Sequence, residues 1–229
     1  MLLRNSRVSE ATTTTRTTPK TTTTKKTTTT KKATTTTKKK VEGKTTKPVD
    51  KTKLNCQNGN WTKETRSGYN WCWQVFFKLY KTRDDAQKDC RSRDANLSGF
   101  QNNQERLNVA ASVQQWLKSE NKKWGMIWIG MQRTENCLTL DSGVCGTGGG
   151  FIWTDGSTNY TTSATTIVWW LPNQPDNFKG GQPDVAMRVY NTTLNLYSGK
   201  LDDVQSPYAT DETGPEMVGY VCGKVATYS

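Results

Sequence analysis

The first 53 residues differ so sharply from the rest of the chain that only residues 54–229 can build a hydrophobic core. This segment contains 21 threonines and 15 lysines and arginines, but no aromatic residue and no cysteine. A chain with so little apolar surface cannot offset the conformational entropy lost on folding. We therefore predict a disordered, low-complexity Thr/Lys-rich stalk over 1–53 and one folded domain over 54–229. The stalk is either a spacer, a spacer that also contacts anionic surfaces, or an artefact of the gene model.

The net charge of +12 belongs to the stalk, because acidic and basic residues balance over 54–229. A nucleic-acid-binding domain carries its positive excess on a folded face, so we expect no specific nucleic-acid partner. The chain has no histidine, which excludes Ser-His-Asp and Cys-His catalysis and histidine-containing zinc sites. No apolar run approaches the length of about 18 residues that predicts a membrane-spanning helix.

All six cysteines lie in the folded part, at Cys56, Cys72, Cys90, Cys137, Cys145 and Cys222. An even number without a CxxC pair predicts three disulfides in an oxidising compartment. Four glycosylation sequons, at Asn60, Asn96, Asn159 and Asn191, indicate the same compartment. We expect a secreted or extracellular glycoprotein. Met1–Arg7 lacks the apolar run of a signal peptide, so either the true N-terminus is missing or the compartment is different, and we favour the first.

The periodicity of residues 54–229 predicts an α+β fold with a large share of loop. Thr82 and Asp85 have the spacing of a capping box, which predicts a helix over 82–93. Asn102 and a period near 3.6 predict a second helix over 103–119. Short apolar runs predict strands at 126–130, 151–153, 185–190 and 218–222. The long region 131–184 is where we expect a functional site.

Several motifs in this part stand in a characteristic order. They are Cys56 with Trp61, Cys72-Trp-Gln-Val-Phe76, Ala86-Gln-Lys-Asp-Cys90, Trp128-Ile-Gly130, Trp153-Thr-Asp-Gly156, Trp170 and Gln174-Pro-Asp176. Together they resemble a C-type lectin domain of the long form, over essentially all of 55–224. The resemblance implies two helices flanking small antiparallel sheets with a long loop region. A single domain of this kind on a stalk, with no other module, is similar to C-type lectins that are abundant in nematodes.

The resemblance also implies disulfide pairs. It pairs Cys56 with Cys72 and Cys90 with Cys222, which leaves Cys137 and Cys145 as a local clip or as two free thiols. The chain departs from the family in lacking a further disulfide, because Asp184 and Ser206 stand where two cysteines are usual. Leu201 likewise replaces a usual tryptophan.

The resemblance further implies a calcium site that binds sugar. Matching the family motif places five oxygen-bearing side chains around one ion: Gln174, Asp176, Gln182, Asp202 and Asp203. Calcium takes oxygen ligands of this kind. Pro175 resembles the cis-proline of the family. The Gln-Pro-Asp order is the version associated with galactose or N-acetylgalactosamine, and Phe178 stands where an aromatic ring would face the sugar.

Other observations keep alternatives open. Gln182 stands where glutamate is usual, and adjacent residues such as Asp202 and Asp203 reach one ion only at an irregular strand end. The same fold could thus serve as a calcium-independent module that binds proteins or surfaces. An enzyme is not expected, because nothing in the spacing of Asp155, Asp184 and Glu216 singles out a catalytic pair. Weak single-site sugar binding would call for multivalency, for example a homo-oligomer.

Overall fold

The computed structural model describes residues 54–56, 59–139, 143, 145, 149–159, 167–208 and 216–227. The predicted stalk over 1–53 lies outside these residues. Two helices and eight strands form an α+β fold in the described part, as the sequence predicts. No helix in it is both long and apolar enough to cross a membrane.

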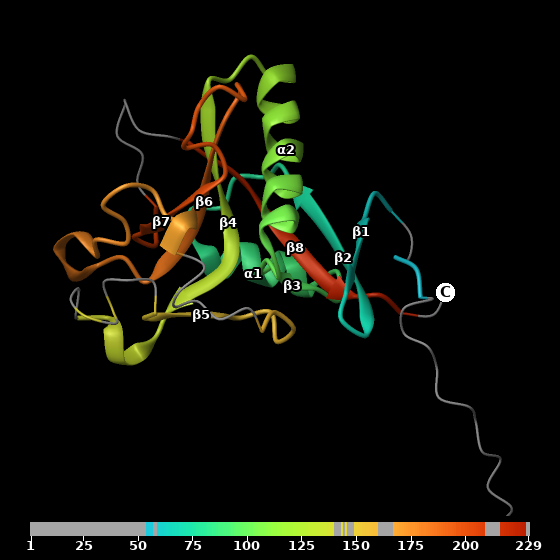
Figure 1. Cartoon of the computed structure of the whole chain (residues 1–229), viewed down its shortest axis with the longest axis horizontal. Coiled ribbons are helices and arrows are strands. Elements are labelled where there is room, and N and C mark those ends of the chain that lie inside the picture. The colour runs from blue at the N-terminus through green and yellow to red at the C-terminus, as the bar shows by residue number, and fades with distance from the viewer. Residues whose placement is uncertain are drawn as a thin grey trace, which may run out of the picture. The chain divides into compact units, whose positions relative to one another are not determined.

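The helices are α1 (Arg83–Arg91) and α2 (Asn103–Ser119). The strands are β1 (Thr62–Arg66), β2 (Tyr69–Phe76), β3 (Asn96–Leu97), β4 (Trp124–Arg133), β5 (Phe151–Trp153), β6 (Asp184–Tyr190), β7 (Lys200–Val204) and β8 (Met217–Val225). They pair in the order β1-β2-β8-β4-β6-β7, while β3 pairs with β8 and β5 with β4. Instead of separate antiparallel sheets, one sheet forms, because β4 and β8 pair in parallel and join its two halves. Figure 1 shows α2 alongside this sheet.

Both helices begin at the caps that the sequence indicates. The Thr82 hydroxyl accepts from the amide of Asp85 at 3.1 Å, and the Asn102 side chain accepts from the amide of Glu105 at 3.0 Å. Each bond satisfies an amide that has no partner within its own helix. Helix α1 is shorter than predicted, and α2 has the predicted bounds.

The four predicted strands are confirmed, and β4 and β8 extend beyond the predicted runs. Strands β1, β2, β3 and β7 were not among the predicted runs, and in β7 the Asp202-Asp203 pair interrupts the apolar pattern. The core contains Trp128, Trp169 and Trp170, as expected for these aromatic residues. Leu201 is fully buried in the same cluster as Trp169 and Trp170, so these neighbours fill the space around the smaller side chain.

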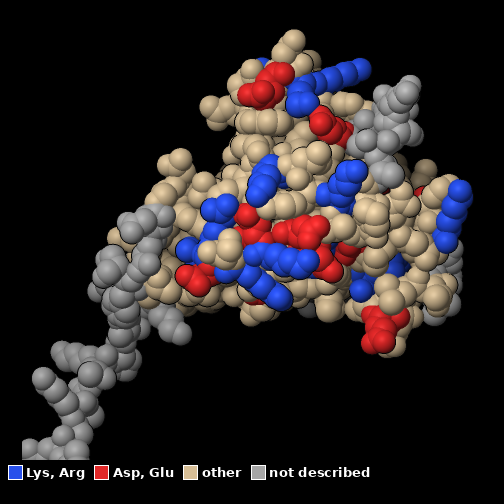
Figure 2. Space-filling model, turned by 180° about the vertical axis from the view of Figure 1, so that it is seen from behind, with Lys and Arg blue, Asp and Glu red and all other residues tan. Residues whose placement is uncertain are grey.

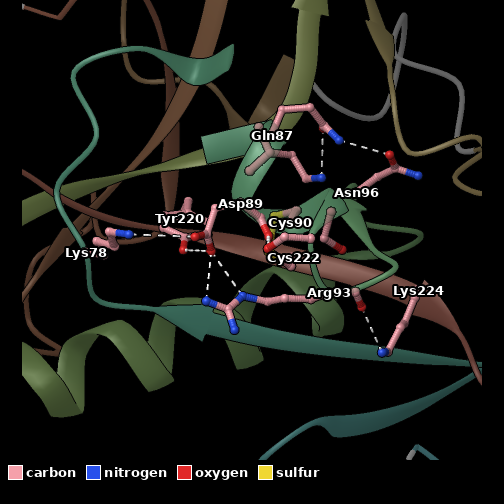
Figure 3. Close-up of a disulfide and its surroundings, with 12 residues drawn as sticks. Lys78, Gln87, Asp89, Cys90, Arg93, Asn96, Tyr220, Cys222 and Lys224 are labelled. Atoms are coloured by element: carbon pink, nitrogen blue, oxygen red, sulfur yellow. Dashed lines mark hydrogen bonds and ion pairs between the residues drawn. A yellow bond between two sulfur atoms is a disulfide. The ribbon is translucent and has the colours of Figure 1, made fainter. Parts of the chain in front are cut away.

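Three disulfides join Cys56 to Cys72, Cys90 to Cys222 and Cys137 to Cys145. The second links α1 to β8, and Figure 3 shows the polar groups beside it. The Asp89 carboxylate accepts from the hydroxyls of Tyr80 and Tyr220 and from the guanidinium of Arg93. Burial raises the pKa of Asp89, but these hydrogen bonds outweigh it and the pKa is lowered.

A buried polar cluster occupies the positions of the missing disulfide. The side chains of Asp184 and Ser206 interact, and the Asp184 carboxylate also accepts from the Gln132 amide at 2.9 Å. The Arg83 guanidinium lies 3.9 Å from Asp184, and the Arg83 backbone amide donates to the Ser206 hydroxyl at 3.4 Å. Polar contacts thus link β6 to the segment after β7, where a disulfide is usual in the family. The same contacts join both segments to α1.

The ends of the folded domain meet at one edge of the sheet. Asn55 forms an antiparallel bridge with Thr227, and Lys63 of β1 donates to the Asn55 side chain at 3.2 Å. Strand β7 lies at the other edge of the strand order. In Figure 1 the C-terminus accordingly lies on the β1 side of the domain.

Candidate functional site

The segment 170–183 connects the core to a solvent-exposed loop beside β7. Trp170 forms a parallel bridge with Leu201, and the amide of Leu171 donates to the Leu201 carbonyl at 2.9 Å. The Gln174–Pro175 peptide bond is cis. Asn177 has a positive φ of 46° and precedes the short 3-10 turn Phe178–Gly180. The loop therefore leaves from the start of β7 and turns back toward β6.

Four of the predicted site residues gather around two backbone amides of this loop. The Asp176 N–H donates to Gln174 Oε1 and to Asp203 Oδ1, both at 3.0 Å. The Phe178 N–H donates to Asp176 Oδ1 at 3.2 Å and to Gln182 Oε1. Two shared donors thus bring together side-chain oxygens from both ends of the loop and from β7.

Asp202, the fifth predicted residue, makes a different contact. Its carboxylate accepts from the Arg188 guanidinium at 2.6 Å, since neighbouring residues of a strand point to opposite faces. Burial raises the pKa of Asp202 to about 6, and the nearby Asp203 and Asp176 carboxylates add to this rise while Arg188 opposes it. Asp202 is therefore within electrostatic reach of the gathered oxygens without sharing their hydrogen bonds.

Asp203 is the most buried residue of the site, and Arg133 is its ion-pair partner. Their side chains are 0% and 1% exposed, and the Arg133 guanidinium donates to Asp203 Oδ2. The Asn177 amide donates to the same oxygen at 2.9 Å. Burial raises the pKa of Asp203, while the amides of Asn177 and Asp176 and the charge of Arg133 oppose the rise.

An exposed aromatic ring and a groove flank these oxygens. Phe178 is 62% exposed, and the Lys179 ammonium lies 5.1 Å from the centre of its ring. Such an exposed ring can face the apolar side of a ligand. A groove of about 550 Å³ begins at Gln174 and is lined by Trp170, Pro172, Leu196 and Tyr197, among others. Leu196 is almost fully exposed at its rim. The surface around the predicted site therefore combines converging oxygens with apolar side chains.

The donors fit calcium in kind, because they are all carboxylate or amide oxygens. They include two carboxylates, Asp176 and Asp203, with Asp202 nearby. Arg133 and Arg188 neutralise part of this negative charge. In the described part of the chain, no three acidic or cysteine side chains lie together as a metal site. The oxygen types therefore suit calcium, whereas the arginine pairs reduce the negative charge available to a cation.

Arg133 and Arg188 are the functional candidates that sequence reasoning missed. Both lie in strands, and Arg133 is the last residue of a strand that is apolar from Trp124 to Met131. A single buried charge at the end of such a strand was the available signal, because a charge is rarely buried without a partner.

A scan of protein families matches residues 60–225 to the family model of C-type lectin domain-containing protein 141/158. The chain belongs to the C-type lectin domain family. C-type lectin 1 from Bitis gabonica is 30% identical over 132 residues, which cover 57% of this chain and 69% of that protein. These matches confirm the resemblance on which the predicted fold and disulfides rest.

Solved structures of other C-type lectin domains are also similar. CEL-I from Cucumaria echinata is 22% identical, with a TM-score of 0.49 over 74% of this chain and 97% of that one. The carbohydrate-recognition domain of cow CD23, solved in the presence of a GlcNAc2Man3 oligosaccharide, is 20% identical with a TM-score of 0.47, over 76% and 98% of the two chains. Members of the C-type lectin family are generally binding proteins rather than enzymes.

Proposed function

We propose that this lectin domain binds carbohydrate at the 174–182 loop, with calcium as a bridging ion and with a preference for galactose-type sugars. The observation that carries the proposal is the gathering of Gln174, Asp176, Gln182 and Asp203 oxygens around two loop amides. These side chains come from segments separated by more than twenty residues, and the loop fold brings them to one place.

Calcium would be held by these four side chains, while Asp202, which pairs with Arg188 on the other face of β7, would add negative charge nearby rather than a ligand. When bound, calcium would accept lone pairs from two neighbouring sugar hydroxyls. The chain's own groups would complete recognition. The Gln174 amide can donate to a hydroxyl and the Asp176 carboxylate can accept from one, so their order selects a pair of hydroxyls. The exposed Phe178 ring would cover the apolar face of a galactose-type sugar.

The setting of this activity is part of the proposal. Three disulfides indicate an oxidising compartment, so we propose that the lectin domain acts outside the cell on glycans with terminal galactose or N-acetylgalactosamine. Multivalent presentation, by a homo-oligomer or by clustered stalks that also contact anionic surfaces, would raise the avidity of a weak single site. On the face drawn in Figure 2, acidic and basic side chains are interspersed.

A second candidate is a calcium-independent recognition module for a protein or another surface. It is favoured by the Arg133–Asp203 ion pair, which already supplies a positive charge to one predicted calcium ligand. The exposed Leu196 side chain, which lines the groove, favours it as well.

Glycan-array binding in millimolar calcium and again with a chelator separates the candidates. We expect galactose-type glycans to bind in calcium only, and Asp176→Ala to abolish both this binding and the thermal stabilisation by calcium. Asp84→Asn, which alters an exposed side chain of α1, is the matched control. Binding that persists in chelator would favour the second candidate, and an array without any bound glycan would refute the sugar assignment.

A further inference from the structure

Arg133 connects four segments of the domain through one side chain. From the end of β4, its Nε donates to the Gln182 carbonyl at 3.1 Å and one terminal nitrogen donates to the Cys145 carbonyl at 3.3 Å. The other terminal nitrogen donates to the Asp203 carboxylate on β7. The guanidinium lies 4.5 Å from the centre of the Phe151 ring, which covers it on one side.

Asp203 links Arg133 to the candidate binding loop. Its two carboxylate oxygens accept from the consecutive amides of Asp176 and Asn177, at 3.0 and 2.9 Å. These amides lie directly after Pro175 and before the turn that carries Phe178. The position of the Asp203 carboxylate therefore fixes the backbone from which the site residues extend.

A carboxylate with a fully buried side chain requires a compensating positive charge. Among the residues that the structure describes, Arg133 is the cation in ion-pair contact with Asp203. The same planar guanidinium also donates to the backbone carbonyl of Gln182, at the far end of the same loop. Both ends of the loop are thus held to one guanidinium, directly at Gln182 and through Asp203 at Asp176 and Asn177.

We propose that Arg133 is a built-in cation that orders the 174–182 loop, so that the loop keeps its shape whether or not a metal ion is bound. Arg133 is a positioning residue in this role, because it acts on the site through Asp203 and the loop backbone. The role is independent of the proposed sugar specificity, and it holds equally for a calcium-dependent lectin and for a calcium-independent module.

Hydrogen exchange at the amides of Asp176 and Asn177, followed by NMR on the whole chain, tests this role. In wild type we expect both amides to stay protected in chelator, with less than a twofold change on adding millimolar calcium. In Arg133→Gln we expect exchange at both amides to rise at least tenfold in chelator, and Arg133→Lys to restore part of the protection. Arg93→Gln, which removes a guanidinium paired with Asp89 beside α1, is the matched control and should leave both amides unchanged.

Protection of the β4 amides of Ile127 and Ile129, which lie in the core, shows whether each variant is folded. If Arg133→Gln does not fold, the wild-type comparison decides, because exchange that rises tenfold on chelation would overturn the role. Unchanged protection in a folded Arg133→Gln would overturn it as well. Loss of sugar binding in chelator with the amides still protected would support both this role and the proposed function, since the two readouts report different events.

Discussion

Around α1 and β8, apolar packing and the Cys90–Cys222 disulfide hold the chain together, whereas buried arginines do so around the 174–182 loop. The first region joins a helix and a strand that are 132 residues apart through one covalent bond. In the second region Arg133 pairs with Asp203, and Arg188 pairs with Asp202. The contrast shows that a loop-rich region can be given a defined shape by charges rather than by a large apolar core.

The contrast also bears on how each region can change. A covalent cross-link stabilises by restricting the unfolded chain and does not depend on local polarity. A buried ion pair depends on both partners, and loss of one leaves an uncompensated charge. At the candidate site, substitution of either charged partner would therefore leave the other buried without compensation.

The largest expected effect is the loss of the long disulfide. Cys90→Ala with Cys222→Ala should lower the free energy of unfolding by about 5 kcal/mol, because the bond closes a very long loop. The corresponding loss at Cys137 and Cys145 should be about 2.5 kcal/mol at most, since that loop spans eight positions. Denaturant unfolding measures both values, and equal losses would contradict the difference between the two regions.

A somewhat smaller effect is expected at the buried pair of the loop region. Arg133→Met should lower the free energy of unfolding by about 3–5 kcal/mol, because Asp203 remains buried without its cation. In Arg133→Met with Asp203→Asn, the loss should be smaller than the sum of the two single losses. A double-mutant cycle from urea denaturation checks this, and additive losses would show that the two side chains are not coupled.

The polar cluster that replaces the family disulfide should contribute less. Arg83→Met should lower the free energy of unfolding by about 1–3 kcal/mol, because Asp184 loses its nearby cation while its hydrogen bond from Gln132 remains. The neighbouring Asp84→Asn changes an exposed side chain and should stay within about 0.5 kcal/mol of wild type. Thermal denaturation of the two variants compares them directly, and equal stabilities would argue against a role for the cluster.

The last prediction concerns glycosylation, for which we expect the smallest change in stability. It compares an exposed sequon with a buried one. Asn60 is exposed, whereas Ser98 of the Asn96 sequon is buried and its hydroxyl accepts from the Trp71 indole at 3.0 Å. In chain produced through a eukaryotic secretory pathway, we expect a glycan on Asn60 and none on Asn96. Peptide mass spectrometry after enzymatic deglycosylation measures occupancy, and a modified Asn96 would show that glycosylation precedes closure of this region.

Much of the fold could be predicted because its signals are local. Thr82 and Asn102 mark the helix starts, and short apolar runs mark four strands. The family motifs supplied two of the disulfide pairs, and the third joins the two cysteines that these motifs left open. The strand Lys200–Val204 escaped prediction because its two aspartates are buried by partners elsewhere in the chain, which no local pattern shows.

At the candidate site, too, residues within a motif could be predicted, whereas contacts between distant segments could not. The positions of Gln174, Asp176, Gln182 and Asp203 follow from a motif, and the structure brings their oxygens together. That Arg133 would reach Asp203, seventy positions away, depends on the pairing of β4, β6 and β7. Calcium binding by these residues stays a prediction.

The bridge between Asn55 and Thr227 has a consequence for how the domain is displayed. Because both ends leave from the edge near β1, a tether at either end would pull on the same corner, far in the strand order from β7 and the loop beside it. A pulling force on such a tether would act at that corner and would not be transmitted through the candidate site. Fusion to another protein at either end should likewise leave that surface open to large partners.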